Sequence, residues 1–439
     1  MRGTDALPVF PDSAKALPNG HLEIAGLDAV ELAREQGTPL YVFDEAELRD
    51  SARRYRTALD THYPGESSII YASKAFSNVA LFRLLAEEGV GFDVVSGGEL
   101  ATTQAAGVDP ANVHFHGNNK GAEELEKAVE SGIGAIVVDN LHELSLLESI
   151  LERLGRTQSI SFRVSPGVDP HTHAHTTTGV LDSKFGLAIQ TGQAEEAIAR
   201  AMQSSRLDVA GLHFHLGSPI FELKPYEEAI QITMEFAAQM KEKYAFSMRM
   251  FSPGGGFAVN YLTTDEAPAP DTYISTISKA IIQGCDVHGL ELPAISIEPG
   301  RSMVGTAGVA LYTVGATKLL PDIRTYVSVD GGMGDNIRPA IYGSEYEAVL
   351  ASRMADAEEI TVTIAGKYCE SGDILVRDCS LPTPAAGDIL AIPVSGAYCI
   401  AMSSTYNANP RPEVVLVSNG DVRTIRRRET YEDLMRLDV

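Results

Sequence analysis

Three segments of the sequence place chemically active residues directly after short apolar runs. Lys74 stands between small and apolar neighbours, residues 253–257 contain three consecutive glycines, and residues 298–301 read Glu-Pro-Gly-Arg. A lysine amine that loses its hydration is more readily neutral and can form a Schiff base. Backbone N–H groups of a glycine turn can approach a phosphate closely. The carboxylate of Glu298 would favour a protonated pyridine nitrogen, so the set favours pyridoxal 5'-phosphate as cofactor.

Each of these features also has a simpler interpretation. Lys74 would then be a lysine at a helix start whose ammonium group reaches water. The glycines would form only a tight turn, and Glu298 would pair with Arg301 on the surface. The occurrence of all three features in one chain favours a cofactor site over these separate roles.

Two imidazoles and a hydroxyl accompany a further apolar run, in the sequence HFHLGS at residues 213–218. Alternate residues of a strand point to one face, so the spacing does not show whether His213 or His215 would stack on a cofactor ring. His213 lies deeper in the run, where a buried and hydrogen-bonded histidine is the ordinary case.

The apolar runs that position these residues predict an α/β fold. Eight short runs rich in β-branched and aromatic residues alternate with segments of helical periodicity. The predicted strands lie at 67–71, 91–95, 113–116, 135–139, 160–164, 209–213, 248–252 and 294–297. Eight such units in about 250 residues fit a closed (β/α)8 TIM-type barrel, whose active site lies at the carboxyl ends of its strands. An open doubly wound sheet is the alternative, but no G-x-G-x-x-G follows the first strand.

A second, all-β domain is predicted from the C-terminal part of the chain. Runs of Val, Ile and Thr punctuated by Gly and Pro occupy 361–365, 372–376, 388–393 and 413–417. The early run at 40–43 has the same character and is expected to join them. The predicted domains are therefore a barrel at 46–308 and a β-rich domain formed by 1–45 and 309–439.

Composition restricts the classes of partner. The chain has 439 residues with 35 Lys and Arg against 59 Asp and Glu, a formal net charge of -24, which argues against binding nucleic acid or anionic lipid. Neither a signal peptide nor a membrane-spanning run is recognisable, so a cytoplasmic protein is expected. The four cysteines form no close pair of the zinc or redox type, and we expect free thiols.

Several longer motifs resemble the diaminopimelate decarboxylase family, within the alanine-racemase-like class of pyridoxal-phosphate decarboxylases. The resemblance extends from GTPL at 37–40 to about residue 412. The matching motifs are FHGNNK at 115–120, PHTH at 170–173, DSKFG at 182–186, DGGM at 330–333, NIRP at 336–339, CESGD at 369–373 and GAY at 396–398. The chain departs from the pattern at 174–176, where an acid and bulkier residues are expected.

The resemblance implies a role for each site residue. Lys74 would carry the cofactor, with Lys184 a lower-ranked second candidate, and His215 would stack on its ring. The implied cofactor-binding residues are Lys74, Asp93, His215, Ser218, Gly255, Gly256, Glu298, Gly300, Arg301 and Tyr398. Arg301, Arg338 and Tyr342 would hold the distal carboxylate of the substrate. Glu370 would contact the distal ammonium group of the substrate, and Tyr398 would close the pocket. Cys369 would be the proton donor, and Lys74, Cys369, His215 and Glu298 form the implied catalytic set.

The activity implied by the resemblance is decarboxylation of meso-2,6-diaminopimelate to L-lysine, the last step of lysine biosynthesis, by a homodimer whose active site is shared across the interface. The alternatives are an ornithine or arginine decarboxylase of the same fold, a racemase, and a non-catalytic pyridoxal-phosphate-binding homologue. Ornithine lacks a distal carboxylate, so Arg338 and Tyr342 argue for the dicarboxylate. Three alternate histidines at 171–175 could ligate a metal, but no carboxylate or cysteine set completes a site nearby, and no metal is expected.

Overall fold

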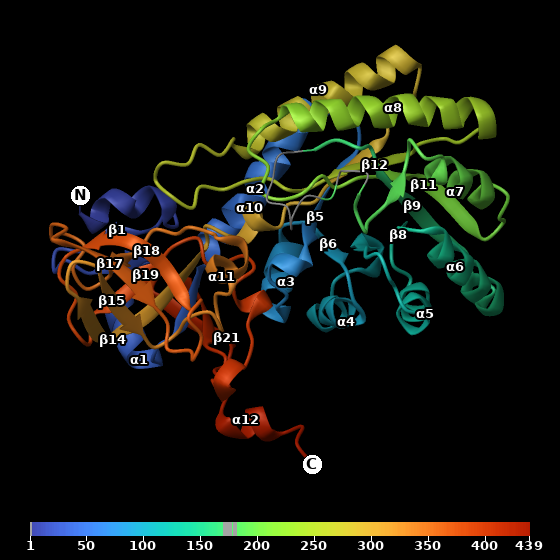
Figure 1. The fold of residues 1–439 in the computed structure, drawn as a ribbon. Helices are drawn as coiled ribbons and strands as arrows, with labels where there is room; N and C mark the ends of the chain where they lie inside the picture. The colour runs from blue at the N-terminus through green and yellow to red at the C-terminus, as the bar shows by residue number, and fades with distance from the viewer. Residues whose placement is uncertain (1, 170–177, 179–181) are drawn as a thin grey trace. The chain divides into compact units, whose positions relative to one another are not determined.

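Figure 1 shows the computed structural model, which describes residues 2–169, 178 and 182–439. The chain forms two compact units. One, called here the barrel unit, comprises Ala52–Ala258 and Ala267–Gly300; the other, called the β unit, comprises Met1–Ser51, Val259–Glu266 and Arg301–Val439. The predicted domain boundaries at 46 and 308 stay predictions, and the units divide the chain at somewhat different positions. The histidine motif at 171–175 and the departure at 174–176 lie outside the described residues.

The barrel unit is built on a closed parallel sheet, as the sequence predicts. In the described part of the chain its eight strands are β5 (Ser67–Ala72), β6 (Gly91–Val94), β7 (Val113–Phe115), β8 (Ala135–Val138), β9 (Gln158–Ser165), β11 (Leu207–His213), β12 (Met250–Gly254) and β13 (Ala294–Ile297). Each pairs in parallel with its neighbours, and the pairs β8–β9 and β13–β5 complete the closure. The short strand β10 (Leu187–Ala188) adds to β9.

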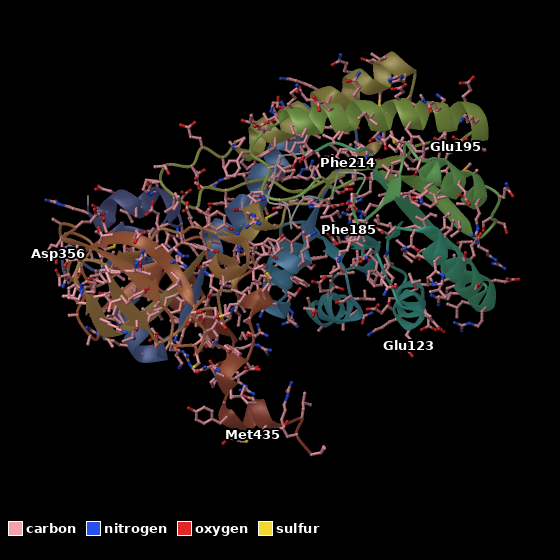
Figure 2. All side chains as sticks on the ribbon, viewed as in Figure 1. Glu123, Phe185, Glu195, Phe214, Asp356 and Met435 are labelled. Atoms are coloured by element: carbon pink, nitrogen blue, oxygen red, sulfur yellow. The ribbon has the colours of Figure 1, made fainter. Side chains whose placement is uncertain are left out.

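Helices cover the outside of the barrel. They are α2 (Glu45–His62), α3 (Val79–Glu87), α4 (Gly97–Ala106), α5 (Ala122–Ser131), α6 (Leu141–Leu154), α7 (Gln193–Ala201), α8 (Lys224–Tyr244) and α9 (Pro270–His288). The helix α2 precedes β5, and the others follow barrel strands. Asn78, Ser96 and Asn140 start three of them, because each side chain accepts a hydrogen bond from a backbone N–H of the first turn. Figure 2 shows Glu123 on the outside of α5, whereas Phe214 lies within the barrel unit and is buried.

Strand register explains why one end of the barrel is polar inside. Phe92 and Phe162 lie in the same strands as Asp93 and Arg163 but on the opposite face, as the twofold strand period requires. Register places Asp93 beside His114, and His213 beside Arg163 and Ser252. These polar side chains are buried, so the barrel interior holds a layer of titratable groups near the carboxyl ends of the strands.

The β unit is mostly sheet. Its main sheet has the order β18-β17-β15-β14-β4-β20-β21. The strands are β4 (Leu40–Asp44), β14 (Gly308–Leu320), β15 (Arg324–Val329), β17 (Ile360–Ala365), β18 (Ile374–Leu381), β20 (Glu413–Ser418) and β21 (Asp421–Arg426), with β16 (Val349–Leu350) and β19 (Ile389–Ile392) joined through β14. The predicted early strand is confirmed as β4, which lies between β14 and β20.

Smaller elements complete the two units. β1 (Lys15–Ala16), β2 (Leu22–Ile24) and β3 (Leu27–Asp28) form a separate small sheet. The β unit also carries α1 (Ala29–Gln36), α10 (Arg301–Val304), α11 (Arg338–Tyr342) and α12 (Tyr431–Met435). Segments of 3-10 helix are η1 (Gly3–Val9), η2 (Ser73–Ala75), η3 (Pro110–Asn112), η4 (Ile400–Met402) and η5 (Tyr406–Ala408). None of the helices in the described ranges is both long and apolar enough to cross a membrane.

Candidate active site

The parallel strands bring the barrel's predicted site residues to one end. Lys74 lies in η2, directly after β5, and its side chain is exposed. The sequence favours a desolvated lysine here, whereas the structure leaves Lys74 exposed. Asp93 lies on β6, and Glu298 follows β13; both are buried.

Both carboxylate oxygens of Glu298 have hydrogen-bond partners. His213 Nε2 lies 3.0 Å from Oε2, and the Ser252 hydroxyl donates to Oε1 over 2.8 Å. Burial alone would raise the pKa of Glu298, but His213 and His116 lower it well below its ordinary value. Glu298 is therefore a buried, ionised carboxylate, and a surface ion pair is excluded as its setting.

Asp93 faces Glu298 across the barrel interior with an unsatisfied oxygen. Its Oδ1 lies 3.8 Å from His116 Nε2, which in turn lies 3.8 Å from Glu298 Oε1. Within the described residues neither Asp93 Oδ1 nor His116 Nε2 has a hydrogen-bond partner. Burial raises the pKa of Asp93 to about 8, although Lys74 opposes this shift. Buried polar atoms without partners are rare in native proteins, so this part of the barrel fits a polar ligand.

A glycine cradle lies beside His215. The Gly255 N–H donates to His215 Nδ1 over 3.4 Å, and burial lowers the pKa of His215 well below its ordinary value. A Cβ on Gly255 would lie 1.8 Å from the Glu298 carbonyl oxygen, and one on Gly256, where φ is +102°, would lie 2.3 Å from the Gly217 oxygen. Only glycine fits these positions, because the protein's own backbone fills the space that a side chain would need.

The remaining cradle residues lie close in sequence to these groups. Ser218 directly follows Gly217, and its side chain is half-buried. A Cβ on Gly300 would lie 3.0 Å from the Ala72 side chain at the end of β5. The barrel mouth thus combines small residues, a neutral imidazole and an ionised carboxylate, a set that fits the phosphate and pyridine groups of pyridoxal phosphate.

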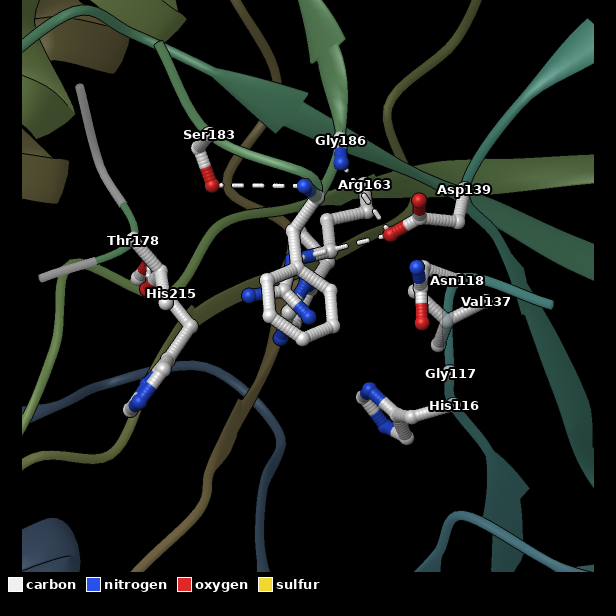
Figure 3. Close-up of polar contacts among 12 residues, drawn as sticks. His116, Gly117, Asn118, Val137, Asp139, Arg163, Thr178, Ser183, Gly186 and His215 are labelled. Carbon is white, nitrogen blue, oxygen red and sulfur yellow. Dashed lines mark hydrogen bonds and ion pairs between the residues drawn. The ribbon is translucent and has the colours of Figure 1, made fainter. Parts of the chain in front are cut away.

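Arg163 is a buried charge that the sequence analysis missed. Its Nε lies 3.9 Å from Asp139 Oδ1, and its guanidinium carbon lies 4.4 Å from the centre of the Phe185 ring. Figure 3 shows Asp139 directed toward Arg163 and Gly186, whose N–H donates to Asp139 over 3.1 Å. An arginine within the mostly apolar predicted strand at 160–164 is the sequence signal that could have identified it. Lys184, the second candidate for the cofactor lysine, is exposed beside the Phe185 ring.

Two arginines of the β unit share one phenol. Arg301 and Arg338 are both buried, and both donate through Nη1 to the hydroxyl oxygen of Tyr261, Arg301 over 2.6 Å. Burial alone would raise the pKa of Tyr261, but the two guanidinium groups lower it. Tyr398, which has a φ of +60°, places its ring 4.9 Å from the Arg301 guanidinium carbon. The structure thus brings together the predicted residues Arg301, Arg338 and Tyr398, and adds Tyr261, which the sequence analysis missed.

The other predicted residues of the β unit lie on its surface or near it. Tyr342 follows Arg338 by one turn of α11 and is half-buried. Cys369 and Glu370 are exposed in the connection between β17 and β18, where the Cys369 N–H donates to Asn407 Oδ1 over 2.8 Å. Among the described residues all four cysteines are free thiols, which confirms that prediction.

A comparison with known protein families identifies the class of enzyme to which the chain is similar. A family described as the pyridoxal-binding domain of pyridoxal-dependent decarboxylases matches residues 45–305. The barrel and the groups at its mouth fit that class, and pyridoxal 5'-phosphate is its cofactor.

Closer relatives give the family. The chain is 46% identical to the diaminopimelate decarboxylase of Bacillus subtilis over 421 residues, which are 96% of each chain. It is 45% identical to that of Halalkalibacterium halodurans, covering 98% of each. Its structure matches that of diaminopimelate decarboxylase from M. jannaschii in complex with L-lysine, with a TM-score of 0.92, 36% identity and coverage of 100% of this chain and 99% of the other. The chain belongs to the diaminopimelate decarboxylase family.

Proposed function

We propose that this chain removes one carboxylate of meso-2,6-diaminopimelate as carbon dioxide and releases L-lysine, as the last step of lysine biosynthesis. The observation that carries the choice of substrate is the arginine pair on Tyr261. Arg338 is buried, and no carboxylate among the described residues pairs with it. A buried cation without an anionic partner is costly, which favours a site built for a carboxylate of the substrate. This biosynthetic role favours a cytoplasmic protein.

The proposed cofactor site lies at the barrel mouth. Lys74 would hold the cofactor covalently, His215 would stack on its ring, and Asp93 and Glu298 would face its polar edge. Ser218, Gly255, Gly256 and Gly300 would complete the barrel's cofactor-binding residues, and the family resemblance implies Arg301 and Tyr398 as further cofactor-binding residues. When bound, the cofactor supplies a pyridinium ring that withdraws electrons from the carbon that loses its carboxylate.

The barrel residues supply charge and orientation for this chemistry. Glu298 is ionised and is fixed by His213 and Ser252, so its carboxylate favours a proton on the ring nitrogen without first having to reorient. Burial keeps His215 neutral, which suits a stacking group beside an electron-poor ring better than a second positive charge would. The glycine cradle offers backbone N–H groups to a phosphate.

The proposed substrate residues come from the β unit. Arg301, Arg338 and Tyr342 would bind the carboxylate that the reaction retains, because a forked guanidinium matches the geometry of a carboxylate. Glu370 would pair with the neighbouring ammonium group, and Tyr398 would bound the pocket. Cys369 would hold a proton on Sγ and deliver it to the carbon from which carbon dioxide has left.

We further propose that the working unit is a homodimer with twofold symmetry, in which Cys369 and Glu370 of one subunit complete the site of the other. Both residues are exposed on the β unit, which leaves them accessible to a second copy.

The test of the proposed function is a substrate panel with the purified protein and pyridoxal phosphate. Carbon dioxide and L-lysine are measured with meso-diaminopimelate, ornithine, arginine and lysine as separate substrates. The proposal predicts equal amounts of both products from diaminopimelate and little from the others. Preference for ornithine or arginine would contradict the carboxylate site, and cofactor binding without turnover of any amino acid would favour a non-catalytic homologue.

A further inference from the structure

Tyr261 is held in place by its own segment of chain. It belongs to the stretch Val259–Glu266 of the β unit, where the Tyr261 and Leu262 N–H groups both donate to Asp265 Oδ2. The next residue, Thr263, donates through its N–H and its hydroxyl to Glu347 Oε1. The Tyr261 ring meets the ring of Tyr346 edge-on, with centroids 5.2 Å apart. The backbone and the ring of Tyr261 are therefore both held in place, and with them the position of the hydroxyl group.

The hydroxyl oxygen of Tyr261 accepts hydrogen bonds from two positively charged side chains. Arg301 and Arg338 reach it from positions 40 and 77 residues away in the sequence. The guanidinium carbons also lie 5.7 Å and 4.8 Å from the centre of the same ring. Two buried cations repel each other, and a shared acceptor between them reduces that cost. Tyr261 thus determines where the two guanidinium groups lie relative to each other.

A substrate carboxylate needs the same N–H groups that the phenol now occupies. Arg338 donates through Nη2 to the Ser344 hydroxyl over 3.1 Å, so its plane is fixed by two contacts on different sides. A phenol can donate as well as accept, because its oxygen carries a proton in addition to two lone pairs. The hydroxyl could therefore turn from acceptor to donor when an anion arrives.

We propose that Tyr261 is a positioning residue for the retained carboxylate of the substrate: it holds Arg301 and Arg338 in the arrangement that a carboxylate requires, and donates its hydroxyl proton to that carboxylate on binding. This inference rests on the proposed function, which assigns the arginine pair to the distal carboxylate. Tyr261 makes no contribution to bond breaking, so its effect falls on affinity for carboxylate-bearing ligands.

The test compares two ligands that differ only in the retained carboxylate. L-lysine carries it and cadaverine does not, and the binding of each to the holoenzyme is measured by calorimetry for wild type and Tyr261→Phe. The proposal predicts that the variant binds L-lysine about 10-fold or more weakly, with cadaverine changed by less than about twofold. In turnover of diaminopimelate, KM should rise by a similar factor while kcat stays within about twofold.

A matched control is Tyr63→Phe, which removes another buried hydroxyl, one that donates to the Pro293 carbonyl in the barrel unit. This control should leave the ratio of lysine to cadaverine affinity unchanged. An equal loss of affinity for both ligands in Tyr261→Phe, or no loss for either, would overturn the positioning role. Wild-type protein that binds cadaverine as tightly as L-lysine would instead overturn the carboxylate site of the proposed function, so the two failures are distinguishable.

Discussion

His213 Nε2 lies 3.0 Å from Glu298 Oε2, and both side chains are buried in the barrel. The two residues come from β11 and from the end of β13, strands separated by β12 in the sheet. Ser252 of β12 occupies the place between them and donates to the other oxygen of Glu298. The carboxylate is therefore fixed before any ligand arrives, which is the condition under which an electrostatic group costs least reorganisation.

Removing the histidine should release the carboxylate. His213→Ala is expected to lower kcat by roughly 10- to 100-fold, as the loss of an outer hydrogen-bond partner does in other sites. Glu298→Gln keeps the size of the side chain but loses its charge, and should lower kcat by about 10²-fold or more. Steady-state kinetics together with the dissociation constant of the cofactor test both variants. Full activity in Glu298→Gln would show that ring protonation does not depend on this residue.

Lys74 should be the residue that retains the cofactor covalently. Reduction of the holoenzyme with borohydride, digestion and mass spectrometry should place the cofactor on the peptide containing Lys74. Lys74→Ala should lose both the adduct and turnover, because no other amine replaces a positioned nucleophile. The matched control is Lys184→Ala, which removes an exposed lysine and should retain the adduct. An adduct on Lys184 in wild-type protein would reverse the assignment.

Mixed dimers test whether the site is shared. Lys74→Ala and Cys369→Ala are each expected to be nearly inactive as pure proteins. If Cys369 acts in the site of the other subunit, random mixing should restore roughly a quarter of wild-type activity, because half of the dimers carry one intact site. Activity is measured after the two variants are unfolded together and refolded, with each variant treated alone as the control. No recovery in a mixture shown to contain mixed dimers would place Lys74 and Cys369 in the same subunit's site.

His116 should lower the stability of the fold in mild acid, whereas the neighbouring carboxyl of Asp93 should raise it. Burial is the largest cause that lowers the pKa of His116 well below 6.5, with His114 lowered as well. At His116 the unfolded chain then binds more protons than the folded one below about pH 6.5, so the contribution of this residue to the free energy of unfolding falls as pH decreases. His116 contributes roughly 1 kcal/mol of such a loss between pH 7.5 and 5.5. Asp93, whose pKa burial raises to about 8, keeps a proton in the folded chain and contributes in the opposite direction.

The effect of one histidine can be isolated. His116→Gln removes the titrating group, so the change in free energy of unfolding on going from pH 7.5 to 5.5 should favour the folded state by roughly 1 kcal/mol more in the variant than in wild type. Chemical denaturation of the holoenzyme at the two pH values measures this difference. An identical pH dependence in the variant would mean that His116 takes up a proton as readily in the folded barrel as in the unfolded chain.

Much of the barrel follows from local patterns in the sequence. All eight predicted strands are present, because each is a short apolar run bounded by turn residues. The residues after them are found together because parallel strands end on one side. Lys74 and Glu298 could be selected in this way, whereas the choice of His215 over His213 rests on the family resemblance. His213 is buried and hydrogen-bonded, as its deeper position in the strand predicts.

Other parts of the site depend on contacts that no local pattern contains. Tyr261 meets Arg301 and Arg338 only through the folding of the β unit, and a tyrosine in a loop of polar residues carries no distinctive spacing. Arg163 lies in a mostly apolar predicted strand, which gives no sign of its partner. The burial of its charge beside Asp139 depends on closure of the barrel. The roles of Cys369 and Glu370 came from family resemblance, since an exposed loop does not indicate where a second subunit lies.

The most direct test of the account follows one carboxylate of the substrate. Meso-diaminopimelate labelled with carbon-13 only in the carboxylate of its D-centre is given to the holoenzyme, and both products are analysed by mass spectrometry and chiral chromatography. If Arg301 and Arg338 hold the carboxylate of the L-centre, all of the label appears in carbon dioxide and the product is unlabelled L-lysine. Label retained in lysine, or formation of D-lysine, would show that the arginine pair holds the other end of the substrate.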